Sequence, residues 1–135
     1  MKTNRSLILV GLVCVLTVSA PMFAHHGYAA YDMTTTMTLK GTITSFELAN
    51  PHSSIAFDAK DDSGNIVHWV VETGAPARGM RASGFTPDTL KPGDQVSITF
   101  NPGKEADKHI GVFKKVELSD GKVYPLAQSG GGPAQ

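Results

Sequence analysis

The fold depends on the stretch Leu39-Lys40-Gly41-Thr42-Ile43-Thr44-Ser45-Phe46-Glu47-Leu48. Apolar and polar residues alternate along it, which predicts a β-strand. The alternation changes phase in the middle, because odd positions are apolar or small up to Ile43 and even positions are apolar from Phe46 onward. A β-bulge produces such a change, since one extra residue in a strand bends it. We therefore predict a curled first strand here.

Two further alternating segments follow, at residues 53–59 and 66–72. Each places β-branched or aromatic residues on one face, as a half-buried strand does. The residues between them, Asp61-Asp62-Ser63-Gly64-Asn65, have the composition of a tight turn. These segments are predicted to form a hairpin.

A different pattern covers Ala75–Ala82, where Pro76 occupies a suitable first helical turn and Gly84 follows where a helix would end. Alternation resumes at residues 95–100 and 110–118, which predicts two more strands. The predicted order is strand, strand, strand, helix, strand, strand.

That order, with a curled first strand, is the order of the OB-fold, a small five-stranded and partly open β-barrel. An antiparallel sandwich without closure is the alternative that the same strands allow. We expect an all-β, OB-like barrel with one short helix at residues 39–124. An N-terminal arm at residues 25–38 would precede it, and a flexible tail at residues 125–135 would follow.

The N-terminal segment has the composition of an export signal. Lys2 and Arg5 precede an apolar run over residues 6–19, which is shorter than the roughly 20 residues that a membrane span needs. We predict that residues 1–24 are a cleaved signal peptide. The mature protein would be periplasmic or secreted and would have no membrane span.

The cleavage position has two candidates. Cleavage after Ala24 leaves His25 as the mature N terminus. Cleavage after Ala20 fits the small-residue rule better, but Pro21 is a poor residue directly after the cut. We favour Ala24.

Charge and cysteine content exclude several functions. The chain has 12 basic and 12 acidic residues, and the signal removes Lys2 and Arg5 but no acidic residue, which leaves a net charge of −2. This balance does not favour binding to nucleic acid or to anionic membranes. Removal of Cys14, the sole cysteine, excludes disulfides and thiolate ligands.

Histidines are the candidate metal ligands. As an N-terminal residue, His25 offers its α-amine and its imidazole to one ion, and their ordinary pKa values, near about 8 and about 6.5, allow a metal to displace the protons at neutral pH. Nitrogen ligands in a plane suit Cu(II). This arrangement is similar to the histidine brace of copper proteins. The third ligand would be His52, in Asn50-Pro51-His52, or the adjacent His26.

Other residues are assigned around this site. Glu47 and Glu72 end their strands near the same rim and could complete or orient it. His68 and His109 are expected at a strand surface and in a loop, respectively, and not as ligands. The alternative without a metal is that His25 and His26 form a solvated terminus and that His52 only caps a turn.

Several motifs together resemble a family of exported bacterial proteins known as domain of unknown function 6152. They span nearly the whole mature chain, and they are Ala24-His25-His26 with Tyr28, Leu39-Lys40-Gly41-Thr42-Ile43-Thr44, Asn50-Pro51-His52, Val67-His68-Trp69-Val70-Val71-Glu72, Gly74-Ala75-Pro76 and Leu90-Lys91-Pro92-Gly93-Asp94. The resemblance implies export and a compact β domain, and it implies no established activity.

Three functions compete. The first is a non-catalytic copper-binding protein that uses His25, His26 and His52. The second is a metal-free OB-fold module that binds a peptide, a glycan or a small envelope ligand through Phe46, Ile55 and Trp69. The third, copper-dependent oxygen chemistry, is disfavoured because so small a barrel offers no extended substrate platform. The sequence identifies no partner protein.

Overall fold

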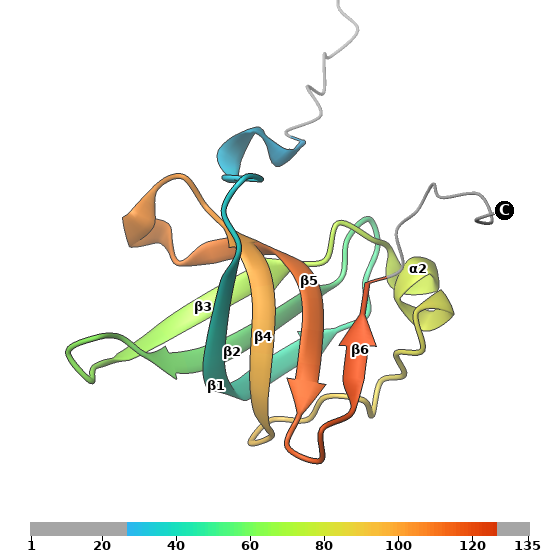
Figure 1. Cartoon of the computed structure of the whole chain (residues 1–135). Helices are drawn as coiled ribbons and strands as arrows, with labels where there is room; N and C mark the ends of the chain where they lie inside the picture. The colour runs from blue at the N-terminus through green and yellow to red at the C-terminus, as the bar shows by residue number, and fades with distance from the viewer. Residues whose placement is uncertain (1–26, 127–135) are drawn as a thin grey trace, which may run out of the picture.

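The strands form one sheet that closes on itself (Figure 1). The computed structural model describes residues 27–126. The elements in chain order are η1 (Tyr28–Ala30), β1 (Met37–Glu47), β2 (Ser54–Lys60), β3 (Ile66–Glu72), α2 (Ala77–Ala82), β4 (Gln95–Pro102), η2 (Ala106–Lys108), β5 (Ile110–Leu118) and β6 (Val123–Pro125). Both η elements are single turns of 3-10 helix.

The strand order is β3-β2-β1-β4-β5-β6, and an additional pairing joins β3 to β5. Strands β1 to β5 therefore make a closed barrel. It is a mixed barrel, because β3 and β5 are parallel while the other pairs are antiparallel. The predicted small all-β, OB-like barrel with one short helix is confirmed.

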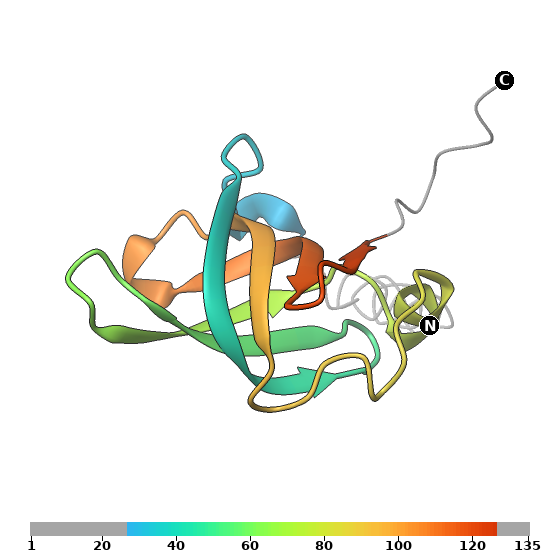
Figure 2. The same ribbon diagram turned by 60° about the horizontal axis from the view of Figure 1, so that its bottom comes forward.

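Strand β1 is curled as predicted. Its register with β2 shifts between Ile43 and Ser45, which is the expected bulge. The first half of β1 pairs with β4 and the second half with β2, so β1 crosses the barrel wall obliquely (Figure 2). Gly41 lies where the two pairings overlap, and a Cβ atom there would lie 2.5 Å from the Asp58 carbonyl oxygen. A larger residue would push β1 and β2 apart.

The core fills the barrel with aromatic and β-branched side chains. Phe57 and Phe100 pack edge to face with ring centroids 6.1 Å apart, and Phe85 packs on Phe113 at 5.9 Å. The buried side chains are Ile43, Ile55, Phe57, Ala59, Val71, Met80, Phe85, Leu90, Val96, Ile98, Phe100, Phe113 and Val116. Burial of this set supplies the main folding energy, since no disulfide is available.

Helix α2 lies at one end of the barrel, and the turn between β2 and β3 lies at the other (Figures 1 and 2). Pro76 is the N-cap of α2, Met80 points into the core, and Gly84 follows the helix with φ of 88°. The helix and hairpin predictions are confirmed, with β2 and α2 starting one or two residues later than the predicted segments.

The C-terminal part differs from the prediction. Val123–Pro125 form a sixth strand on β5, and the Leu126 N–H donates to the Lys114 carbonyl at 2.8 Å. The tail therefore cannot begin at residue 125, because Tyr124 packs on Phe85 with centroids 5.2 Å apart and holds this segment. Residues 127–135 lie outside the described residues.

The predicted signal peptide, residues 1–24, and both cleavage sites also lie outside the described residues. Within residues 27–126, no helix is long and apolar enough to cross a bilayer.

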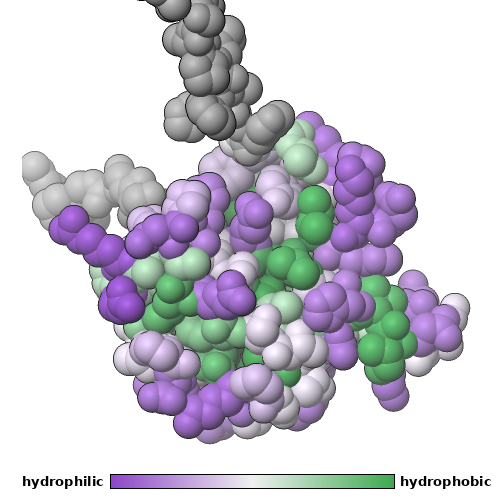
Figure 3. All heavy atoms as spheres, turned by 180° about the vertical axis from the view of Figure 1, so that it is seen from behind, coloured by the Kyte–Doolittle hydropathy of each residue, from purple (hydrophilic) through white to green (hydrophobic). Residues whose placement is uncertain are grey.

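Exposed apolar side chains are scattered. Large ones with substantial exposure are Tyr28, Met33, Ile66 and Val123. On the face seen in Figure 3, hydrophobic residues form separate patches among hydrophilic ones. Single exposed apolar residues are normal for a globular domain and indicate no interface by themselves.

Candidate functional site

The loop between β1 and β2 presents His52 at one end of the barrel. It contains a cis peptide bond between Asn50 and Pro51, and His52 is exposed. Ser53, directly after His52, is fully buried; its hydroxyl accepts the Ala49 N–H at 3.1 Å. The buried serine thus anchors the loop next to an exposed imidazole.

This loop is tied to the segment that follows β3. The Ser53 N–H donates to the Ala75 carbonyl at 2.9 Å, and the Thr73 N–H donates to the Ser53 carbonyl at 2.9 Å. The Ala77 N–H donates to the Ala49 carbonyl, also at 2.9 Å. Residues 73–77 therefore act as a rigid support for the His52 loop, because each bond joins backbone groups that have few alternative partners when buried.

The N-terminal arm is tied to the end of β4. Tyr31 forms an isolated bridge with Gly103, the Asp32 N–H donates to the Pro102 carbonyl at 2.8 Å, and the Lys104 N–H donates to the Ala30 carbonyl at 2.9 Å. These bonds fix the direction in which the chain enters the domain.

Tyr28 of the arm contacts the same support segment. The Tyr28 hydroxyl lies over Gly74, where a Cβ atom would be only 2.6 Å from it. Gly74 has φ of +64°, which L side chains rarely adopt, so both the backbone and the close tyrosine favour glycine. Gly74 lies between Thr73 and Ala75, which hold the His52 loop. The Tyr28 side chain therefore contacts the same segment that is hydrogen-bonded to the His52 loop.

Tyr31 pairs with a predicted site residue. Burial raises the pKa of the Tyr31 phenol, and the charge of Glu72 and a side-chain hydrogen bond to Glu72 raise it further. The phenol therefore stays protonated and donates to the carboxylate. This contact occupies part of the Glu72 carboxylate.

Glu47 and Glu72 lie on one face of the sheet. Glu47 pairs with Ser54, and Ser54 pairs with Glu72, so the two glutamates flank one serine across three strands. Two strand spacings separate their backbones by about 10 Å. Both side chains are exposed. The predicted placement of the two carboxylates near one rim agrees with this register, and the separation favours one of them at most as a direct ligand.

Asp32 fixes the turn that leads from the arm into β1. Its carboxylate accepts the Thr34 N–H at 3.0 Å and the hydroxyls of Thr34 and Thr35 at 2.6 Å each. These hydrogen bonds stabilise the charged form and lower the pKa of Asp32 from 3.8 to about 2.

We expect the stabilising effect of Asp32 to depend on pH. Because the folded pKa lies below the unfolded one, the contribution is complete above about pH 4 and is lost as the pH falls toward 2. Asp32→Asn should lower the melting temperature at pH 6, and the difference from the unsubstituted protein should shrink between pH 4 and pH 2. Thermal unfolding followed by circular dichroism measures this. A difference that is constant from pH 6 to pH 2 would contradict it.

The other predicted ligands are placed as follows. His25 and His26 lie outside the described residues. Residues 27–126 contain no group of three or more His, Cys, Asp or Glu side chains that could hold a metal ion by themselves.

The remaining histidines lie elsewhere. His68 is exposed on β3, and its Nδ1 lies 2.7 Å from an Asp58 carboxylate oxygen on β2. His109 packs against Trp69 with ring centroids 5.1 Å apart.

The predicted ligand face is not an exposed surface. Ile55 is fully buried in the barrel, because its side of β2 points inward. Phe46 is half-buried and packs on Phe85 at 5.8 Å, and Trp69 is half-buried and packs on Phe100 at 5.2 Å. Inclusion of Ile55 in a ligand face was therefore wrong, since alternation alone does not say which side of a strand faces the core.

A groove that sequence reasoning missed lies beside the arm. It has a volume of about 680 Å³ and is bordered by Tyr28, Met33, Arg78, Val112 and Lys114, among others. The volume is in the range of small-molecule sites, and most of the surface is apolar.

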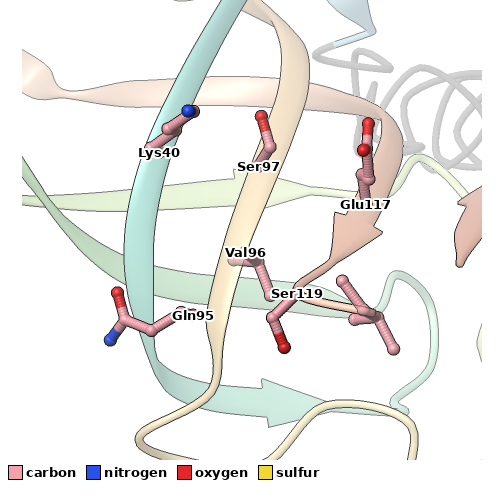
Figure 4. Close-up of a pocket in the computed structure, with 7 residues that line it drawn as sticks. Lys40, Gln95, Val96, Ser97, Glu117 and Ser119 are labelled. Atoms are coloured by element: carbon pink, nitrogen blue, oxygen red, sulfur yellow. The ribbon is translucent and has the colours of Figure 1, made fainter. Parts of the chain in front are cut away.

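A shallower pocket lies on β1, β4 and β5 (Figure 4). Lys40, Ser97 and Glu117 follow one another across the three strands there, because Lys40 pairs with Ser97 and Ser97 with Glu117. No histidine lines this pocket. Its opposite charges flank a hydroxyl, which is an ordinary solvated strand surface.

Comparison with known proteins gives one family. No curated protein matches the chain. A family model described as a family of unknown function, DUF6152, matches residues 12–113, which is more than half of the sequence and includes β1 to β4 and half of β5. The chain therefore belongs to this family of unknown function, as the sequence motifs predicted.

Proposed function

We propose that this protein is exported and binds copper, without catalysing a reaction, at a site that combines the mature N terminus with His52. One observation supports the proposal: the Tyr28 side chain contacts Gly74, and the His52 loop is hydrogen-bonded to the neighbouring residues Thr73 and Ala75. The chain before Tyr28 is therefore joined to the domain at the rim that also presents His52.

Covalent geometry limits how far His25 can lie from this rim. Two residues span at most about 7 Å of extended chain, so the His25 Cα stays within that distance of the Gly27 Cα. If the signal is cleaved after Ala24, the α-amine and the imidazole of His25 belong to the same residue and form a chelate. A chelating residue on a short tether loses little freedom when it binds.

Three nitrogen donors suit Cu(II), which favours tetragonal sites of nitrogen and oxygen ligands. His25 would provide two donors. His52 is our candidate for the third, because its loop is held by Ser53 while its side chain remains exposed. His26 is the alternative third donor, and Glu47 or Glu72 would orient the donors by hydrogen bonds.

His52→Ala is expected to weaken Cu(II) binding by about tenfold or more, because the site loses one of three nitrogen ligands. The matched control is His68→Ala, which removes an exposed imidazole from β3 and should leave the affinity unchanged. Both affinities are measured by competition with a chromophoric chelator on protein that begins at His25. Equal affinities of the two variants would contradict the role of His52.

The groove beside the arm supports the second candidate, a metal-free module that binds a small envelope ligand. Its walls are mostly apolar, and Arg78 and Lys114 are the charged residues that line it. A ligand in this groove would reduce the solvent exposure of Met33 and Val112, and a chelator would not change that effect. A ligand whose binding is abolished by chelation would instead support the copper site.

A further inference from the structure

A second cavity gathers the kinds of side chain that bind a soft metal ion. It has a volume of about 340 Å³ and lies where β1 begins, beside β3 and the loop between β4 and β5. The residues that line it with polar, polarisable or aromatic side chains are Met37, Trp69, Glu105 and His109. We call this the Trp69 cavity. His52 does not line it.

His109 is held in an unusual backbone conformation at this cavity. Its φ of 45° and ψ of 47° are left-handed, which costs a residue other than glycine about 1 kcal/mol or more. The conformation persists because both sides of the loop are paired: the Val70 N–H donates to the His109 carbonyl at 3.1 Å, and the Gly103 N–H donates to the Ile110 carbonyl at 2.8 Å. Strain of this kind often accompanies a functional side chain.

The His109 imidazole contacts the indole and leaves its nitrogens free. The rings meet edge to face, with centroids 5.1 Å apart and planes at 75°. Among residues 27–126, no side chain or backbone group forms a hydrogen bond with either His109 ring nitrogen. A half-buried imidazole nitrogen without a partner is available as a metal ligand.

Met37 and Trp69 complete the set. The Met37 thioether is a soft ligand, and soft sulfur ligands select Cu(I) among biological metals. Trp69 packs on Phe100, and its ring also lines the cavity. Of the aromatic side chains, indole attracts a cation to its face most strongly.

The charges around the cavity favour a monovalent cation. Glu105 lines it, and the Lys108 ammonium lies 2.8 Å from a Glu105 oxygen. The charges of this pair cancel, so the cavity has no excess negative charge to balance a divalent ion. A monovalent ion bound by neutral sulfur and nitrogen ligands does not need such an excess of negative charge.

We propose that Met37 and His109 bind a soft monovalent metal ion, Cu(I), against the face of Trp69. This site would hold the reduced ion, whereas the N-terminal site would hold Cu(II). Met37 begins β1 and His109 directly precedes β5, so the proposal does not depend on where the signal is cleaved.

Ag(I) is the probe, because it resembles Cu(I) in ligand preference and does not change oxidation state under these conditions. Trp69 is the only tryptophan of the protein, so its fluorescence reports this cavity alone. We expect saturable quenching by one equivalent of silver nitrate in chloride-free buffer. Met37→Leu and His109→Asn should each weaken the binding by about tenfold or more. Asparagine tolerates the left-handed backbone and removes the imidazole.

The controls are Met33→Leu and His68→Gln, which remove an exposed thioether and an exposed imidazole outside the cavity. Both should bind Ag(I) like the unsubstituted protein. Circular dichroism confirms the fold of each variant, and competition for Cu(I) with bathocuproine disulfonate repeats the comparison without fluorescence.

Quenching that is unchanged in Met37→Leu and His109→Asn, or that is equally weakened in the controls, would overturn the proposal. Protein that begins at Pro21 should bind Ag(I) as tightly as protein that begins at His25. Loss of Ag(I) binding in the Pro21 form would assign the ion to the N terminus and would also overturn it.

Discussion

Protein that begins at Pro21 is expected to bind Cu(II) at least about 100-fold more weakly than protein that begins at His25. In the longer form the His25 nitrogen is a peptide amide, which is not a free base at neutral pH, and the free amine lies four residues away. The chelate of amine and imidazole is lost. A 100-fold change corresponds to about 2.7 kcal/mol of binding free energy.

The control for this comparison is built into the chain. Both forms contain every histidine of the mature protein. They differ in whether the His25 backbone nitrogen is a free amine or an amide, and in residues 21–24, which add the Pro21 amine and the Met22 thioether. Met22→Leu in the longer form removes that thioether. Equal Cu(II) affinities of the His25 and Pro21 forms would show that the N-terminal amine is not a ligand.

Phe100→Ala is expected to lower the free energy of unfolding by about 3–5 kcal/mol. Phe100 is fully buried and lies between Phe57 and Trp69, with ring centroids 6.1 and 5.2 Å away. Truncation removes the transfer free energy of the ring and leaves a cavity that three surrounding strands cannot fill. A domain of this size has a total stability of about 5–15 kcal/mol, so the variant would lose a large part of it.

Urea unfolding followed by circular dichroism measures this loss without relying on Trp69. Ile66→Ala is the matched control, because Ile66 is 62 % exposed and its truncation should change stability by no more than about 0.5 kcal/mol. A loss below about 1 kcal/mol for Phe100→Ala would contradict the central position of this ring in the core.

Local signals predicted most of the fold. The phase change after Ile43 predicted the bulge in β1, and the turn residues between β2 and β3 predicted the hairpin, because each depends on neighbouring residues. The order of the elements then selected the OB-like barrel. Pro76 and Gly84 marked the ends of α2 in the same way.

Long-range contacts escaped sequence reasoning. Strand β6 is short and is held by Tyr124 on Phe85, which is far from it in the chain. Ile55 is fully buried in the barrel, and alternation within β2 does not show which side of the strand faces the core. Such pairings depend on residues that have no signature in the sequence around them.

The candidate site was predicted in part. Glu47 and Glu72 end β1 and β3, and His52 lies in the loop before β2, as the pattern of strands predicted; their role at a metal site stays a prediction. The contacts of Tyr28 with Gly74 and of Tyr31 with Glu72 did not follow, because they join the arm to residues that are far from it in the sequence. The sequence feature that could have indicated these contacts is the pair Tyr28 and Tyr31, which closely follows His25 and His26.

The copper site is tested most directly on the exported protein itself. Intact mass spectrometry of the secreted or periplasmic product locates its N terminus, and a Cu(II) titration follows on the same material. We predict a chain that begins at His25 and binds one equivalent of Cu(II) through the amine and imidazole of that residue. A product that begins at Pro21, or one that begins at His25 and binds no stoichiometric copper, would contradict the proposed function.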